Sequence, residues 1–317
     1  MNSEIIGIHH VTAIAGDPQT NLSFYTEVLG LRLVKRTVNF DDPGTYHLYY
    51  GDDAGRPGTL ITFFPWPGIS KGRRGVGQFA AISFAIPETA FGFWIDRFAA
   101  RGVSFDRPFS RLDEKVLAFY DPDELKLELV AGVEAESSGR TRSVPLSHGI
   151  TGLHSVALLE ESGRDTAEFL TGALGFRFVR EEDGRFRFEV GRGGSGAVID
   201  LIRLPTARRG RIAVGTVHHV AWRVPDADTQ ILWREKLVRV LPDVTPVIDR
   251  TYFRSIYFRE PGGALFEIAT DPPGFTVDEP MDSLGERLAL PPWLEYGRSR
   301  IENKLPHLVV PSRHRAA

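Results

Sequence analysis

Hydrophobic and polar positions follow the same order four times along this chain. Each repeat opens with a run rich in β-branched and other apolar residues, at 7–14, 79–86, 153–159 and 218–224. Such runs of four to eight residues are typical of strands buried on at least one face. Each repeat is therefore expected to begin with a short strand.

A helix and three further strands are expected after each opening strand. In the first repeat, Leu22, Tyr25 and Leu29 share one face at helical spacing, and Gly30 follows as a stop signal. Three β-rich segments come next, LRLVKRTVNF, YHLYYGD and TLITFFP. The pattern of one unit is βαβββ.

Direct repeats support four copies of this unit. The segment FYTEVLGLRLVKR, from Phe24, matches FLTGALGFRFVRE, from Phe169, and the same offset places His9 on His154. We expect an α+β fold in which four βαβββ units pair into two domains with curled mixed sheets. The predicted domains are 1–135 and 146–272, each with two units. The tail, 273–317, is predicted to hold a helix near 293–305 and could cap a domain or a pocket.

Composition narrows the possible chemistry. The 317 residues include 38 Lys plus Arg and 41 Asp plus Glu, so a net charge of −3 gives no general attraction to nucleic acid or anionic membranes. Neither a signal peptide nor an apolar run of about 18 residues is found. Without cysteine there is no disulfide, thiolate metal site or Cys nucleophile, which fits a reducing cytoplasm. Any metal must be held by nitrogen and oxygen.

Equivalent positions in the four units can be compared for chemistry. The first and fourth units together offer His10, His219 and Glu267, a set common for divalent Fe, Mn, Ni and Zn and typical of non-haem Fe(II) oxygenases. A lone His or Glu in a strand is more often a satisfied polar residue, but two matched histidines favour a metal. In units one to four, the position compared in the opening strand holds His10, Ala81, Ser155 and His219. The position compared in the closing strand, here called the closing position, holds Phe63 (register open by one residue), Glu128, Asp200 and Glu267.

Other polar residues have weaker claims to a site. Glu128 and Asp200 could form a weak vestigial site, although no histidine joins them. His154 aligns with His9 rather than His10, which argues against a ligand role. His47 is interpreted as a wall or core residue.

The motifs GIHHVT, FYTEVLGL and ALFEIATDPPGF resemble the vicinal oxygen chelate superfamily, which includes glyoxalase I, bleomycin-resistance proteins and type I extradiol dioxygenases. The segments VKRTVNFDDPGTYHLYYGD, HHVAWRVPD and LPPWLE are similar to its hydroquinone ring-cleaving branch, typified by 2,6-dichlorohydroquinone 1,2-dioxygenase. This resemblance implies Fe(II), or sometimes Mn(II), held by His10, His219 and Glu267. It also implies second-sphere roles for His9, Thr12, His218, Arg250 and Tyr257.

Strand parity tests some of these roles. Thr12 shares a face with His10, because residues two apart in a strand point the same way. His9 and His218 should point away, so they either line a neighbouring wall through local twist or are buried structural histidines. Tyr257 is the best candidate acid. Arg250 could hold substrate oxygens or form a surface salt bridge.

The predicted function is an Fe(II)-dependent extradiol-type dioxygenase that cleaves hydroquinone-like or catechol-like aromatics with O2. Two alternatives stay open: a glyoxalase-like isomerase or lyase, which usually needs four protein ligands, and a non-catalytic drug-sequestering binder. The oligomeric state is also open, with a homo-oligomer among the alternatives.

Overall fold

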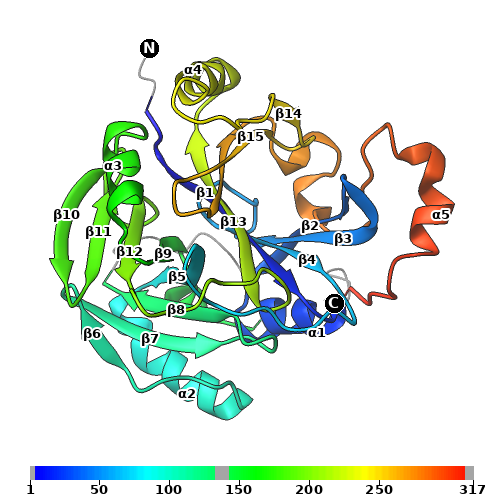
Figure 1. Cartoon of the computed structure of the whole chain (residues 1–317). Helices are drawn as coiled ribbons and strands as arrows, with labels where there is room; N and C mark the ends of the chain where they lie inside the picture. The colour runs from blue at the N-terminus through cyan, green and yellow to red at the C-terminus, as the bar shows by residue number, and fades with distance from the viewer. Residues whose placement is uncertain (1–3, 133–142, 311–317) are drawn as a thin grey trace.

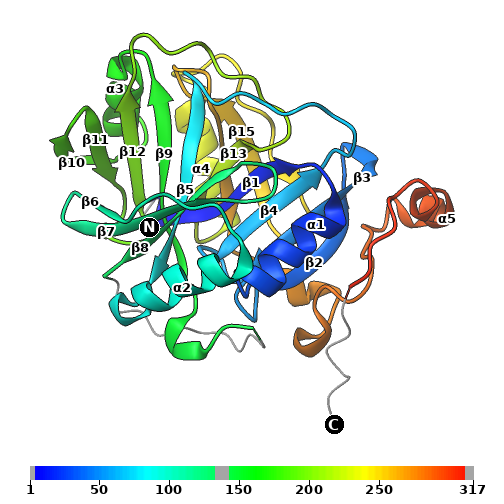
Figure 2. The same ribbon diagram turned by 90° about the horizontal axis from the view of Figure 1, so that it is seen from below.

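The computed structural model describes residues 4–132 and 143–310, and its main feature is a pair of curved eight-stranded mixed sheets. Figures 1 and 2 show the two sheets side by side, with the helices at the periphery and α5 (Arg298–Glu302) at one edge of the molecule. The four predicted βαβββ units are confirmed. Among the described residues, no helix is both long and apolar enough to cross a membrane.

Each unit has the expected order of elements. The first consists of β1 (Gly7–Ala15), α1 (Pro18–Ser23) with a π-helical turn (Phe24–Val28), β2 (Arg32–Asn39), β3 (Asp42–Gly51) and β4 (Leu60–Pro65). The second consists of β5 (Gln78–Ile86), α2 (Phe91–Arg101), β6 (Phe109–Arg111), β7 (Glu114–Tyr120) and β8 (Lys126–Ala131).

The third and fourth units repeat this order. The third consists of β9 (Gly152–Glu160), α3 (Arg164–Gly172), β10 (Arg177–Glu182), β11 (Arg185–Glu189) and β12 (Val198–Arg203). The fourth consists of β13 (Thr216–Val224), α4 (Ala227–Leu237), β14 (Ile248–Asp249), β15 (Arg254–Arg259) and β16 (Leu265–Thr270). Short 3-10 turns lie at Glu88–Ala90, Leu146–His148, Phe275–Val277, Met281–Ser283 and Glu295–Gly297.

The sheets join units from opposite ends of the chain. One has the order β14-β15-β16-β13-β1-β4-β3-β2 and combines the first and fourth units, while the other has the order β10-β11-β12-β9-β5-β8-β7-β6 and combines the second and third. Each sheet thus combines one unit from the predicted range 1–135 with one from the predicted range 146–272. Equivalent opening strands carry the same pattern, so the repeat alone does not specify which of them pair. Here β1 pairs antiparallel with β13, and β5 with β9.

Local sequence explains where several helices begin and end. Asp17 caps α1 and Asp226 caps α4, and each carboxylate accepts a hydrogen bond from the backbone N–H three residues later. Gly102 ends α2 at a φ of 65°, a left-handed conformation that favours glycine. The helices bury aromatic side chains such as Trp94 and Trp233 against the sheets.

The tail runs back along β2 in the first unit. Lys35, fully buried on β2, donates to Asp278 at 2.5 Å and also pairs with Glu279. The backbone N–H of Ala289 donates to the carbonyl of Arg36. The predicted tail helix is shorter than expected, because α5 covers only Arg298–Glu302.

Candidate metal centre

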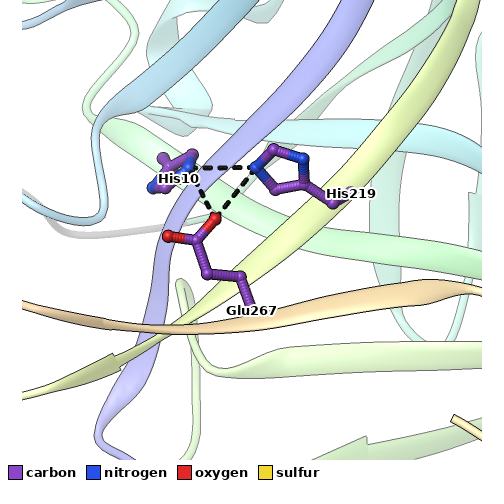
Figure 3. A group of neighbouring side chains, drawn as sticks. All are labelled: His10, His219 and Glu267. Atoms are coloured by element: carbon purple, nitrogen blue, oxygen red, sulfur yellow. Dashed lines mark hydrogen bonds and ion pairs between the residues drawn. The ribbon is translucent and has the colours of Figure 1, made fainter. Parts of the chain in front are cut away.

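The three predicted metal ligands meet at the centre of the first sheet, on its adjacent strands β1, β13 and β16. Figure 3 shows the imidazoles of His10 and His219 and the carboxylate of Glu267 pointing toward one another. All three side chains are buried, and Glu267 has no exposed surface. Their ligand atoms lie within 4.8 Å of one another, and among the described residues they form the only such group of His, Asp or Glu.

The spacing of the donor atoms fits a metal ion. Glu267 Oε2 lies 3.0 Å from His219 Nε2 and 3.4 Å from His10 Nε2, and the two Nε2 atoms are 3.4 Å apart. Ligand bonds of about 2.1 Å at angles between right and tetrahedral require donors about 3.0–3.4 Å apart. Glu267 Oε2 is also buried without a hydrogen-bond partner. A cation between the three atoms would satisfy it.

The electrostatics favour the protonation states that bind metal. Burial raises the pKa of Glu267, but His10 and His219 lower it by more, so this pKa lies well below its usual value. Burial lowers the pKa of His219. A carboxylate and neutral imidazole are the forms that coordinate a divalent cation.

His9 and His218 contact the ring nitrogens of His10 and His219 that do not face Glu267. His9 Nδ1 lies 2.9 Å from His10 Nδ1, and His218 Nδ1 lies 2.7 Å from His219 Nδ1. With Nε2 facing Glu267, each ligand imidazole has its Nδ1–H free to donate to the adjacent histidine, which fixes the ring orientation. Burial lowers the pKa of His9, and that of His218 to about 3, so both stay neutral acceptors.

Two β-bulges bring these adjacent histidines together. In the β1–β13 ladder, Ile8 pairs with Trp222 and His10 with Ala221, so His9 has no partner, and His218 is passed over in the same way. A bulge holds two residues against one and re-aims the side chain. Regular strand parity, which would turn His9 and His218 away, therefore does not apply at these positions.

The register assigns the closing position of the first unit to Thr62, not Phe63. Glu267 lies opposite Ala221, two residues after His219, and Thr62 lies opposite Thr12, two residues after His10. Phe63 points to the other face of the sheet, where it packs in the core against Tyr25. The first unit thus supplies a hydroxyl where the other three supply carboxylates.

A cavity of about 320 Å³ opens beside the ligands His10 and His219. His218, Arg250 and Tyr257 line it, whereas Thr12 and His9 are buried around the ligands. His47 also lines the cavity, which agrees with its interpretation as a wall residue. The other lining residues carried no functional signal in the sequence beyond the aromatic character of the segment TYHLYY. They are Asn39, Phe40, Asp41, Tyr49, Phe64, Trp66, Phe253 and Leu265.

His47 belongs to a hydrogen-bonded chain in the cavity wall. Tyr49 OH lies 2.8 Å from His47 Nδ1, and His47 Nε2 lies 2.9 Å from Thr62 Oγ1. Burial lowers the pKa of His47 and raises that of Tyr49. The neutral imidazole therefore accepts from the tyrosine and donates to the threonine.

Tyr257 and Arg250 are in contact on the side of the cavity next to His219. The Tyr257 ring packs edge-on against His219, with centroids 5.7 Å apart, and its hydroxyl accepts from Arg250 Nε at 3.3 Å. Burial and the charge of Glu267 raise the pKa of Tyr257, so the phenol stays protonated at neutral pH.

In the second sheet, arginines rather than histidines contact the buried carboxylates Glu128 and Asp200. Arg111 donates twice to Glu128, at 2.9 and 2.5 Å. Arg187 donates twice to Asp200, at 2.8 and 3.0 Å, and Arg185 donates once. Guanidinium groups neutralise these buried carboxylates, so they do not form the vestigial metal site considered from the sequence.

Paired curved sheets of βαβββ units with a candidate metal centre on the central strands define a class of small-molecule enzymes and binding proteins. The family model for the Glyoxalase/Bleomycin resistance protein/Dioxygenase superfamily matches residues 7–129 and 152–268. The chain belongs to this superfamily, as its motifs predicted.

Relatives with known names point to one branch. "Putative ring-cleaving dioxygenase MhqO" of Bacillus subtilis is 46% identical over 96% of this chain and 97% of its own. The chlorohydroquinone/hydroquinone 1,2-dioxygenase of Sphingobium indicum is 33% identical over 91% and 92%. The crystal structure of a "putative dioxygenase" from Bacillus subtilis superimposes with a TM-score of 0.93 at 45% identity. The match covers 98% of this chain and 99% of that one.

Proposed function

We propose that this protein is an Fe(II)-dependent dioxygenase that cleaves the ring of hydroquinone-like or catechol-like aromatics with O2. The observation that carries the proposal is a centre of two histidines and one glutamate beside a cavity lined by aromatic rings. The 33% identity to a chlorohydroquinone/hydroquinone 1,2-dioxygenase supports the hydroquinone class. Mn(II) is a second candidate, because the same donor set suits it.

His10, His219 and Glu267 would hold the metal on one side and leave the cavity side open for substrate and O2. When bound, Fe(II) lowers the pKa of a coordinated ring hydroxyl and allows electrons to pass from the ring to O2. His9 and His218 fix the orientation of the ligand imidazoles. The aromatic rings of the cavity would hold the flat substrate by stacking.

Tyr257 is the proposed proton donor. Its hydroxyl stays protonated at neutral pH, and it lies on the same side of the cavity as His219. Arg250 contributes a positive charge that would stabilise anionic oxygens of the opening ring. Thr12 contacts Thr62 beside the ligands and helps to hold this part of the wall.

A glyoxalase-like lyase is the less favoured alternative. Such sites usually use four protein ligands, and the fourth position here holds Thr62, whose hydroxyl is engaged by Thr12 and His47. A non-catalytic binder needs no buried ligand set of this kind. The cytoplasmic location and a homo-oligomeric state stay predictions.

Oxygen uptake tests the proposal. Protein purified without air should contain about one iron per chain and consume about one O2 per ring cleaved with at least one member of a panel of hydroquinones and catechols. His219→Ala should lose iron and turnover, whereas His154→Ala, on the second sheet, should retain both. Iron-loaded protein that consumes no O2 with any diol of the panel would contradict the proposed activity.

A further inference from the structure

The mouth of the cavity joins two segments that are far apart in the sequence. The last residue of β2, Asn39, and the turn after it, Phe40 and Asp41, line the cavity, and the loop after β14 contributes Arg250. The first segment belongs to the first unit and the second to the fourth, so only the pairing of these units brings them together.

One arginine connects this turn to the centre of the cavity. Arg250 Nη2 donates to Asp41 Oδ2 at 3.0 Å, and Nε of the same guanidinium donates to Tyr257 OH at 3.3 Å. The guanidinium also lies over the Tyr257 ring, 5.3 Å from its centroid. Asp41 therefore anchors one edge of the planar group while Tyr257 takes another.

The two ends of this contact differ in exposure. The Asp41 side chain is 73% exposed and that of Arg250 only 17%. Burial lowers the pKa of Arg250, but Tyr257 and Asp41 raise it by more, so the guanidinium stays charged. A mostly buried cation without its counter-charge would turn toward water, because its desolvation would be uncompensated.

We propose that Asp41 is a positioning residue that holds Arg250 against Tyr257 and so determines the geometry of the cavity wall beside His219. The plane of an arginine fork is defined when two of its edges are engaged. The catalytic consequence rests on the proposed dioxygenase function, whereas the positioning itself does not.

The turn that carries Asp41 is held in place. The backbone N–H of Asp41 donates to Asn39 Oδ1 at 3.0 Å. The Phe40 ring packs edge-to-face against Trp293 of the tail, with centroids 5.7 Å apart. The tail thus supports the turn, although no described tail residue lines the cavity.

A matched pair of variants tests the positioning by structure. Asp41→Ala removes the acceptor of Arg250, and Asp113→Ala removes a similar exposed acceptor, that of Arg180 at 2.7 Å on the second sheet. In crystals of the iron-loaded protein, Asp41→Ala should lose the contact between Arg250 Nε and Tyr257 OH, and Asp113→Ala should keep it. An Arg250 that stays in place in Asp41→Ala overturns the inference.

Steady-state kinetics provide a second test of the positioning role of Asp41. Asp41→Ala should bind iron like the wild type but lose about tenfold or more in kcat/KM for a hydroquinone, because small misplacements of a site are costly. In an Arg250→Ala background the same substitution should cause no further loss. An equal loss in both backgrounds would overturn the positioning role. If the wild type consumes no O2, the proposed function fails while the crystal comparison still decides the role of Asp41.

Discussion

Thr62 lies opposite Thr12 on the parallel strands β4 and β1, and their hydroxyl oxygens are 2.7 Å apart. The same register places Glu128, Asp200 and Glu267 in the other three units. The first unit alone therefore offers no fourth protein ligand to the candidate metal centre. In the proposed function, this absence would keep positions available for substrate and O2.

Thr62→Glu should convert the centre to a four-ligand site. A carboxylate at this position would point toward the same region as Glu267, so we expect metal affinity to rise on the order of tenfold. Ring cleavage should fall at least about 100-fold, since one open position would be taken. Chelator competition and oxygen uptake measure the two effects.

Thr62→Gln is the control for size without charge. It should fold like Thr62→Glu but bind the metal no more tightly than the wild type. Equal metal affinity in both variants would show that Thr62 does not occupy a ligand position.

His9→Phe should weaken metal binding without removing a ligand. The Nδ1 atom of His9, 2.9 Å from that of His10, is the partner that orients the ligand ring. Loss of such a partner typically reduces metal affinity about 10–100-fold. Chelator competition is the measurement, with His154→Phe as the control, because His154 pairs with Glu114 on the second sheet. A His9→Phe affinity equal to that of the control would rule out the supporting role.

Lys35→Met should destabilise the protein through the tail. The buried ammonium pairs with Asp278 and Glu279, and its removal leaves these carboxylates without their cation. Breaking a buried pair costs about 3–5 kcal/mol, measurable by denaturant unfolding. Lys71→Met, in an exposed pair with Glu124, should change stability by less than about 1 kcal/mol. Similar losses in both variants would show that burial of Lys35 has no special effect.

Glu160→Gln should change how stability depends on pH. Burial, with a smaller contribution from Glu260, raises the pKa of Glu160 from its ordinary 4.5 to about 8. Between these values the folded state holds a proton that the unfolded state has released, so stability falls as the pH rises from about 4.5 to about 8. The variant should flatten this decline and be more stable than the wild type at pH 9. Unfolding curves across this range measure it, and Glu161→Gln, at an exposed neighbour, should retain the wild-type slope.

The three residues of the candidate metal centre were predictable because they follow the repeat. His10 and His219 occupy one position of equivalent strands, and the period of two in a strand specifies which face that position takes. Glu267 was recognisable as a carboxylate in an otherwise apolar run. The roles of His9 and His218 were harder to predict, since the bulges that bring them to the ligands leave no signal in residue type.

The register of the first unit was open by one residue, and this one residue decides which side chain lies beside the candidate metal centre. Phe63 and Thr62 are adjacent, and adjacent residues face opposite sides of a sheet. Only the pairing of β4 with β1 shows that the hydroxyl, and not the ring, lies beside the ligands.

The sequence by itself determined four βαβββ units, a nitrogen and oxygen ligand set and a family, because periodicity and residue type are local properties of the chain. The tertiary structure decided which strand edges join the first unit to the fourth, and so that Asp41 meets Arg250 across 209 positions. The physical reason is that strand edges offer the same backbone donors and acceptors in every unit. Which edges join depends on packing summed over the whole molecule, and the hydrophobic pattern of a single unit does not specify it.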